Sequence, residues 1–140
     1  MVNVFAYGSL MFSDVLFAVT GAWMRSESAA VRGHCVYAVK GKSYPALLRL
    51  PAGVAQGRLY RGISAAQLKR LDAFEGTWYV RRRVHVLTAQ GRTVAFAYAW
   101  HPAQRNRVAP AGWDDQAFAA YRRRRFAAYW RRRRRRSVSR

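Results

Sequence analysis

Apolar residues recur along most of the chain with the spacing of β-strands. The run from Val4 to Ala6 is rich in β-branched and aromatic residues and ends at Gly8-Ser9, which predicts a buried strand that breaks into a tight loop. Further strands are expected over residues 29–37, 44–50, 54–61, 79–88 and 93–100. Turn signals at 39–43, 51–53 and 89–92 separate them, so the strands follow one another closely.

Two stretches with helical spacing carry capping signals. Ser13 comes directly after the loop and Gly21 follows eight residues later, so a short helix is expected between them. Ser64 and Gln67 have the spacing of a capping box, and the helix that they open is expected to stop near Gly76. The apolar positions are Leu16, Phe17 and Val19 in the first helix and Leu68, Leu71 and Phe74 in the second.

The chain changes character after His101-Pro102, where we expect the sheet to end. Residues 103–112 are typical of a loop, and residues 113–130 predict a last helix that the arginines at 122–125 interrupt. The arginines at 131–136 cannot pack on an apolar core, so we expect one domain over 1–130 and a solvated or disordered tail over 131–140. About six strands with two or three helices indicate an α+β fold with a small mixed, curled β-barrel flanked by helices.

The formal net charge of +20 is unevenly distributed. Eleven of the 26 basic residues lie within residues 121–140, where there is no Asp or Glu, and the remainder carries 15 basic against 6 acidic residues, or +9. Such a field attracts polyanions non-specifically and in a salt-dependent way. Because lysine occurs only at Lys40, Lys42 and Lys69, a compositional preference for arginine accounts for the tail equally well.

Composition also bounds the class of protein. Apolar residues make up 51% of 140 positions, which favours a folded domain. No apolar run approaches the roughly 18 residues that span a bilayer, and the first residues have neither a basic segment nor a small-residue cleavage site. We therefore expect a cytoplasmic protein that does not interact with membranes.

The loop of Tyr7, Gly8, Ser9 and Leu10 is the first candidate for chemistry. Gly8 lets a ligand approach the main chain, and Ser9 places a hydroxyl beside N–H groups that the strand no longer pairs. Such a loop can hold a carboxylate or a developing oxyanion. A strand that ends in Gly-Ser is equally an ordinary structural feature.

Glu75 is the second candidate, in a chain with few acids. A carboxylate at the end of a helix and partly enclosed by Phe74, Trp78 and Tyr79 loses hydration, which raises its pKa toward the range useful for proton transfer. The alternative is an ion pair between Glu75 and one of the arginines at 81–83. Asp72 lies one turn earlier, and we interpret it as a residue of the helix surface.

Other catalytic and metal-binding patterns are missing from the sequence. It contains neither a glycine-rich phosphate loop followed by lysine nor a Gly-x-Ser-x-Gly elbow. His34, His85 and His101 lack metal-ligand spacing, and the single Cys35 has no partner for an internal disulfide. We expect these four residues to be packing or surface residues and no metal site to be present.

Four segments in this order resemble the γ-glutamylcyclotransferase-like superfamily, and most closely its AIG2-like branch. They are FAYGSLM at 5–11, GKSYPA at 41–46, GRLY at 57–60 and LDAFEG at 71–76, followed by Tyr79 and Arg81. The similarity runs from about Val2 to Trp130, so it covers the expected domain and leaves out the arginine tail.

The resemblance implies a small barrel flanked by helices and an enzyme that cleaves γ-glutamyl amines to 5-oxoproline and a free amine. It implies that main-chain N–H groups of one loop bind the γ-glutamyl group, and this loop consists of Tyr7, Gly8, Ser9 and Leu10. It also implies that Glu75 is the general acid/base, with Tyr79 and Arg81 in supporting roles. No cofactor is required, because the nucleophile is the substrate's own amine.

Two other functions remain open at this stage. The arginines at 122–125 and 131–136 suggest a nucleic-acid-binding or polyanion-binding protein on a non-catalytic scaffold. A domain that binds a γ-glutamyl metabolite without turning it over is the other possibility. The amine half of the substrate and the oligomeric state are not encoded in these motifs.

Overall fold

The computed structural model describes residues 1–42 and 44–112. Its strands are β1 (Val2–Ala6), β2 (Ser26–Val39), β3 (Pro45–Ile63), β4 (Tyr79–Thr88), β5 (Gly91–Trp100) and β6 (Val108–Gly112). Its helices are the 3₁₀ helix η1 (Ser9–Met11), α1 (Ser13–Thr20), α2 (Ala65–Glu75) and the 3₁₀ helix η2 (Pro102–Arg107). The expected last helix at 113–130 and the tail at 131–140 lie outside the described residues, so the domain limits stay a prediction.

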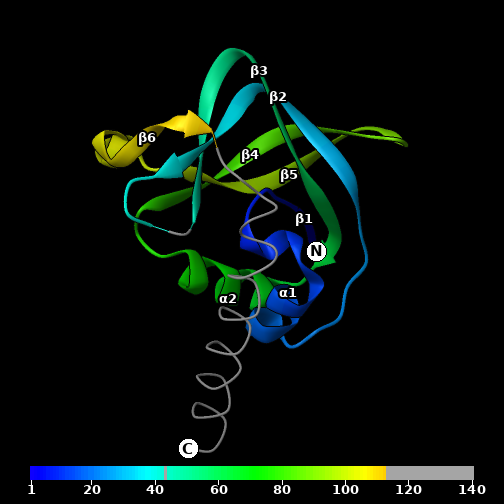
Figure 1. The fold of residues 1–140 in the computed structure, drawn as a ribbon. Coiled ribbons are helices and arrows are strands. Elements are labelled where there is room, and N and C mark those ends of the chain that lie inside the picture. The colour runs from blue at the N-terminus through cyan, green and yellow to red at the C-terminus, as the bar shows by residue number, and fades with distance from the viewer. Residues whose placement is uncertain (43, 113–140) are drawn as a thin grey trace, which may run out of the picture.

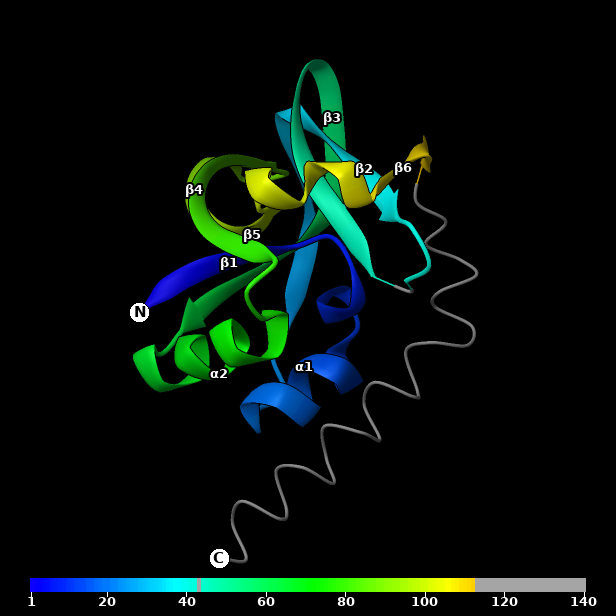
Figure 2. The same cartoon turned by 90° about the vertical axis from the view of Figure 1, so that its left-hand side faces the viewer.

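The six strands form one sheet that curls on itself. Their order is β3-β1-β5-β4-β2-β6, and an additional antiparallel pairing of β2 with β3 joins the two sides. The sheet is mixed, because β1 is antiparallel to β3 and parallel to β5. Figures 1 and 2 show this partial ring, with α1 and α2 packed beside each other at one end of it. The predicted α+β class, with a curled sheet flanked by helices, is confirmed.

Strand β1 is buried on both faces. Val4 and Ala6 belong to a cluster of buried residues that includes Leu16 of α1 and Leu71 of α2. Phe5, between them, belongs to a second cluster inside the curled sheet. A strand covered on both faces carries a continuous apolar run, which is the pattern from which β1 was predicted. Because both clusters fix β1, they also fix the position of the loop that follows it.

The predicted turn at 51–53 is wrong as a strand break, because β3 runs without interruption from Pro45 to Ile63. Residues 51–53 instead lie at an irregularity in the β2–β3 ladder. Arg32 pairs with Val54, whereas His34 pairs with Arg49, so residues 50–53 lie opposite Gly33 alone. Gly33 has a φ of 73°, which glycine adopts without steric cost. The Pro-Ala-Gly sequence therefore marks a bulge that bends one long strand.

The expectation of a loop over 103–112 is also wrong. Residues Pro102–Arg107 form η2, and Val108–Gly112 form β6, which pairs with the edge of β2. The main-chain N–H of Lys40 donates a hydrogen bond of 2.7 Å to the main-chain oxygen of Arg107, which aligns this segment with β2. The pairing partner lies about seventy residues earlier in the chain, so local composition does not signal the strand.

The helix caps agree in part with the sequence. The capping box is confirmed, since the Gln67 N–H donates to Ser64 Oγ at 3.2 Å and the Ser64 N–H donates to Gln67 Oε1 at 2.9 Å. The predicted cap at Ser13 is wrong, because α1 has Phe12 at its N-cap and no side-chain hydrogen bond there. In the described part of the chain, no helix has both the length and the apolar character needed to cross a bilayer.

Candidate active site

A small cavity lies where the end of β1, the end of α2 and the beginning of β4 meet. Its volume is about 30 Å³, room for about one water molecule. It is lined by Tyr7, Gly8, Ser9, Leu10, Glu75 and Tyr79, and further by Phe5, Ala6, Tyr44, Pro45 and Tyr98. The tertiary structure therefore brings the candidate loop and the candidate carboxyl group to one place, although the two are more than sixty residues apart in the chain.

The loop enters the cavity because β1 ends at Ala6 and the chain then turns into η1. The Met11 N–H donates to the Gly8 main-chain oxygen at 3.0 Å, and the Phe12 N–H donates to that of Ser9 at 3.2 Å. The amides of Ser9 and Leu10 precede the first bond within this helical turn, so they have no acceptor within it. Main-chain donors are thus available at the wall of the cavity.

Glu75 reaches the cavity as the last residue of α2. The residue as a whole is half-buried, while loss of hydration raises the pKa of its carboxyl group to about 8. The two ion pairs among the described residues are Arg61 with Glu27 and Arg81 with Asp72. Among residues 1–42 and 44–112, therefore, no arginine forms the alternative ion pair with Glu75.

Two tyrosine hydroxyls beside the cavity are held in fixed directions by main-chain acceptors. The hydroxyl of Tyr7 donates to the main-chain oxygen of Tyr98, and that of Tyr79 donates to the main-chain oxygen of Pro45. Burial raises the pKa of both Tyr7 and Tyr79 well above the ordinary tyrosine value, and a negative charge on nearby Glu75 adds to the rise. These hydroxyls therefore stay neutral and act as donors at physiological pH.

Asp72 is exposed, as predicted for a residue of the helix surface, and it connects the site to its surroundings. Its carboxylate forms an ion pair with Arg81 at 2.9 Å and accepts a hydrogen bond of 2.7 Å from the Tyr98 hydroxyl. Arg81 does not line the cavity, and its guanidinium lies 4.8 Å from the ring centroid of Phe96. Arg81 is therefore connected to the cavity indirectly, through its ion pair with Asp72 and the hydrogen bond from the Tyr98 hydroxyl to Asp72.

Sequence reasoning missed Tyr98 as a cavity residue. It sits in an alternating strand like its neighbours, and its position becomes significant only through the parallel pairing of β1 with β5. Tyr44 and Pro45 carried a signal, since they fall within the GKSYPA segment, but no role was assigned to them from it.

No group of three or more His, Cys, Asp or Glu side chains suited to a metal occurs among residues 1–42 and 44–112. His34 and His85 lie in strands, and Cys35 is an unpaired, half-buried thiol. The site thus consists of one desolvated carboxyl group, main-chain amides and neutral hydroxyls, which together are suited to proton transfer beside a bound carboxylate or oxyanion.

A curled mixed sheet flanked by helices is the fold of γ-glutamyl-cyclotransferase-like proteins, and comparison with known families agrees. The model of the family described as gamma-glutamyl cyclotransferase, AIG2-like, matches residues 4–115. The chain belongs to this family.

Relatives from Arabidopsis thaliana show the same relationship. Protein AIG2 A is 33% identical over 85 residues, which are 61% of this chain and 50% of the relative. AIG2-like protein D is 34% identical over 87 residues, which are 62% of this chain and 57% of the relative. Protein AIG2 B is 28% identical over 124 residues, 86% of this chain and 70% of the relative. The chain thus spans about half the length of the first two of these relatives.

Solved structures share the fold. An Arabidopsis thaliana protein determined in solution superposes with a TM-score of 0.69 at 25% identity, over 94% of this chain and 80% of the other. A protein described as gamma-glutamyl cyclotransferase gives a TM-score of 0.63 at 18% identity, over 71% and 66%. A mouse AIG2-like protein gives 0.60 at 20% identity, over 81% and 88%. The last two likenesses concern the fold alone.

Proposed function

We propose that this protein is a γ-glutamyl amine cyclotransferase, which releases 5-oxoproline and a free amine from a γ-glutamyl substrate. Glu75 acts as the general acid/base, and the loop of Tyr7, Gly8, Ser9 and Leu10 binds the γ-glutamyl group. The observation that carries the proposal is the shared cavity, in which a carboxyl group with a pKa of about 8 lies beside the main-chain donors of that loop.

The reaction begins with a proton transfer. The Glu75 carboxylate takes one proton from the substrate α-ammonium, and a group with a pKa near 8 is a far better acceptor than an ordinary carboxylate. The freed amine then attacks the γ-carbonyl carbon and forms the new C–N bond of a five-membered ring. Both partners belong to one molecule, so this step benefits from a high effective concentration.

The tetrahedral intermediate then collapses. Main-chain N–H groups of Ser9 and Leu10 stabilise the oxyanion while it exists. The bond from the γ-carbon to the original amine breaks, and the Glu75 carboxylic acid returns its proton to the departing nitrogen. The ring nitrogen still carries one proton more than the lactam N–H of the product, and the Glu75 carboxylate removes this proton and passes it to the released amine. The products are 5-oxoproline and the amine in its ammonium form, and Glu75 is again a carboxylate.

The γ-glutamyl group is larger than a cavity of about 30 Å³. We therefore expect the wall formed by Tyr44 and Pro45 to move outward when substrate binds. Tyr79 holds that wall through its hydroxyl, which gives this residue its proposed supporting role. Arg81 is proposed to support the site by holding Asp72.

The direct test is to incubate the full chain with a panel of γ-glutamyl amino acids, peptides and amines and to measure 5-oxoproline by mass spectrometry. Glu75→Gln keeps the shape of the side chain and removes the proton acceptor, so turnover should fall by about 10²-fold to 10⁴-fold. Glu27→Gln is the matched control, since Glu27 lies on β2 and pairs with Arg61. Full turnover by Glu75→Gln would contradict the proposed mechanism.

The panel also separates the alternatives. Binding of a γ-glutamyl compound to the wild-type chain without release of 5-oxoproline would favour a protein that binds the metabolite without turning it over. The polyanion-binding alternative rests on the arginines at 122–125 and 131–136, which lie outside the described residues. It predicts that deletion of the residues after Trp130 lowers nucleic-acid affinity at moderate salt, and unchanged affinity would argue against it.

A further inference from the structure

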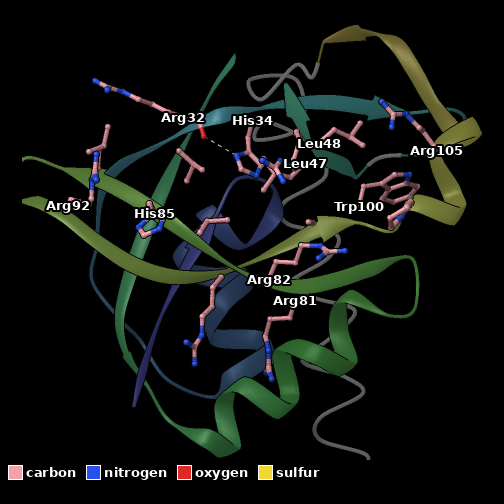
Figure 3. Close-up of a pocket in the computed structure, with 17 residues that line it drawn as sticks. Arg32, His34, Leu47, Leu48, Arg81, Arg82, His85, Arg92, Trp100 and Arg105 are labelled. Carbon is pink, nitrogen blue, oxygen red and sulfur yellow. Dashed lines mark hydrogen bonds between the residues drawn. The ribbon is translucent and has the colours of Figure 1, made fainter. Parts of the chain in front are cut away.

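A second, much larger cavity lies between β2 with β3 on one side and β4 on the other. It has a volume of about 810 Å³, within the range of ligand-binding clefts. Seven of its 17 lining residues are arginines, two are histidines and none is acidic. Figure 3 shows His34 of β2 at the upper wall of this groove, Arg82 of β4 at its lower wall and Arg105 of η2 at its right-hand end.

Most of this positive charge is not neutralised within the described chain. Arg81 pairs with Asp72, and Arg83 lies 5.8 Å from the ring centroid of Phe96. The other five arginines are exposed, and neither ion pair of the described residues includes any of them; they are Arg32, Arg49, Arg82, Arg92 and Arg105. A concave surface with one sign of charge concentrates an oppositely charged partner.

The groove also contains an open strand edge. β4 pairs with β5 along its whole length, from Tyr79 to Thr88, but it pairs with β2 only through Leu87 and Ala30 among the described residues. Beyond that pair β2 stays paired with β3, and none of its further described residues pairs with β4. Among the described residues, the main chain of β4 from Val80 to Val86 therefore has no strand partner on this side. Such an edge is a template for a further strand.

We propose that this groove binds an extended, acidic polypeptide segment, which pairs with the free edge of β4 and places carboxylates beside the arginines. Side chains of a strand alternate between faces, so a segment paired with β4 brings one set of carboxylates toward Arg82 and the other toward Arg81 and Arg83. Strand addition of this kind obtains affinity from main-chain hydrogen bonds and specificity from side chains. This binding surface does not depend on the proposed catalytic reaction.

The groove suits single-stranded nucleic acid less well. Such nucleic acids bind by stacking bases on exposed aromatic rings in addition to charge. The aromatic residue that lines the groove, Trp100, is only 3% exposed, and the nearby Phe96 is covered by the guanidinium groups of Arg81 and Arg83. The geometry therefore favours a partner that pairs through its main chain.

The test uses three fluorescent probes of equal negative charge with the full chain at physiological salt. The first is a peptide of alternating glutamate and threonine, the second replaces each threonine by proline, and the third is an oligothymidylate. Proline lacks the N–H that strand pairing requires, so the two peptides differ in pairing and not in charge. We expect the Glu-Thr peptide to bind at least several-fold more tightly than the other two probes.

Matched variants locate the binding. Arg49→Gln with Arg82→Gln removes one charge from each wall of the groove and should weaken Glu-Thr binding about tenfold, the effect of two partly exposed ion pairs. Arg25→Gln with Lys69→Gln removes the same charge from exposed residues that do not line the groove and should leave affinity within about twofold. Both variants retain the basic tail, so its contribution cancels in the comparison.

Amide hydrogen exchange on the wild-type chain gives a second, independent readout. Glu-Thr peptide should slow exchange over residues 80–86, whereas Glu-Pro peptide should not. The proposal would be overturned by equal affinity for all three probes or by tighter binding of the oligothymidylate. It would also be overturned if both double variants weakened binding equally, or if amide exchange over residues 80–86 did not change.

Discussion

The hydroxyl of Tyr79 donates a hydrogen bond to the main-chain oxygen of Pro45, which joins the first residue of β4 to the first residue of β3. Pro45 also closes over the loop, because a Cβ atom added at Gly8 would come within 2.7 Å of the proline Cγ. The ring of Tyr79 packs edge-on against that of Trp100, with centroids 5.2 Å apart. The wall of the candidate active site thus depends on contacts between strands as much as on the loop.

Tyr79→Phe should lower the free energy of unfolding by about 1 kcal/mol, because the ring packing remains while the Pro45 oxygen loses its donor. Urea unfolding monitored by fluorescence measures this change. Tyr37→Phe is the control, since Tyr37 is half-buried on β2 and does not line the cavity. Equal stability of the two variants would show that the hydrogen bond contributes nothing measurable to closure of the site.

The proposed reaction should depend on pH through Glu75. At pH values below about 8, the pKa of Glu75, most of the free enzyme carries a protonated carboxyl group that cannot accept the substrate proton. We expect kcat/KM to rise with pH and to reach its midpoint near 8, and kcat to reach its midpoint at lower pH because the bound α-ammonium favours the carboxylate. A kcat/KM midpoint near the ordinary value of 4.5 would mean that the carboxyl group is well hydrated.

The same pKa shift makes Glu75 a source of instability at neutral and higher pH. In the unfolded chain the group releases its proton near 4.5, whereas the folded chain holds it up to about 8. The folded state therefore binds more protons between these values, so stability falls as pH rises from about 4.5 to about 8, and no cost is present at lower pH.

Glu75→Gln should remove this cost. At pH 8 its melting temperature should exceed that of the wild type, and its free energy of unfolding should be higher by at most a few kcal/mol. Both differences should shrink toward pH 4.5. Glu27→Gln again serves as the comparison, because its partner Arg61 lowers the pKa of Glu27 and reverses the sign. Parallel melting curves for the Glu75→Gln variant and the wild type at all pH values would contradict the assignment.

Ser64 and Ser13, which both lie at the start of a helix, should contribute differently to stability. Ser64→Ala removes a side chain that accepts from the Gln67 N–H and should cost about 1 kcal/mol of stability. Ser13→Ala should stay within about 0.5 kcal/mol of the wild type, because Ser13 is exposed and Phe12 occupies the N-cap. Chemical denaturation of both variants checks the contrast, and equal losses would indicate that Ser13 contributes a cap after all.

Local chemistry was readable from the sequence. The buried strand before Gly8, the capping box at Ser64 and the alternation in β4 each depend on residues a few positions apart, and the structure agrees with all three. The sequence also indicated that Glu75 loses hydration, but of the three aromatic residues near it in sequence only Tyr79 lines its cavity, and the other aromatic residues there come from distant segments. By contrast, the capping signal at Ser13 misled, since a hydroxyl near a helix start caps it only when the backbone places it at the N-cap.

Only the tertiary structure decided which distant segments meet. Residues 50–53 lie within a strand, and residues 108–112 form β6, because both segments are held by pairing with β2. The energy of this pairing outweighs the local turn and loop signals. Arg81 had two acidic residues within reach in sequence, and in the folded chain it pairs with Asp72 while Glu75 lines the loop cavity. The amino-acid sequence determined which residues are capable of the chemistry, whereas long-range strand pairing determined which of them lie together, because that pairing joins residues whose separation no local pattern encodes.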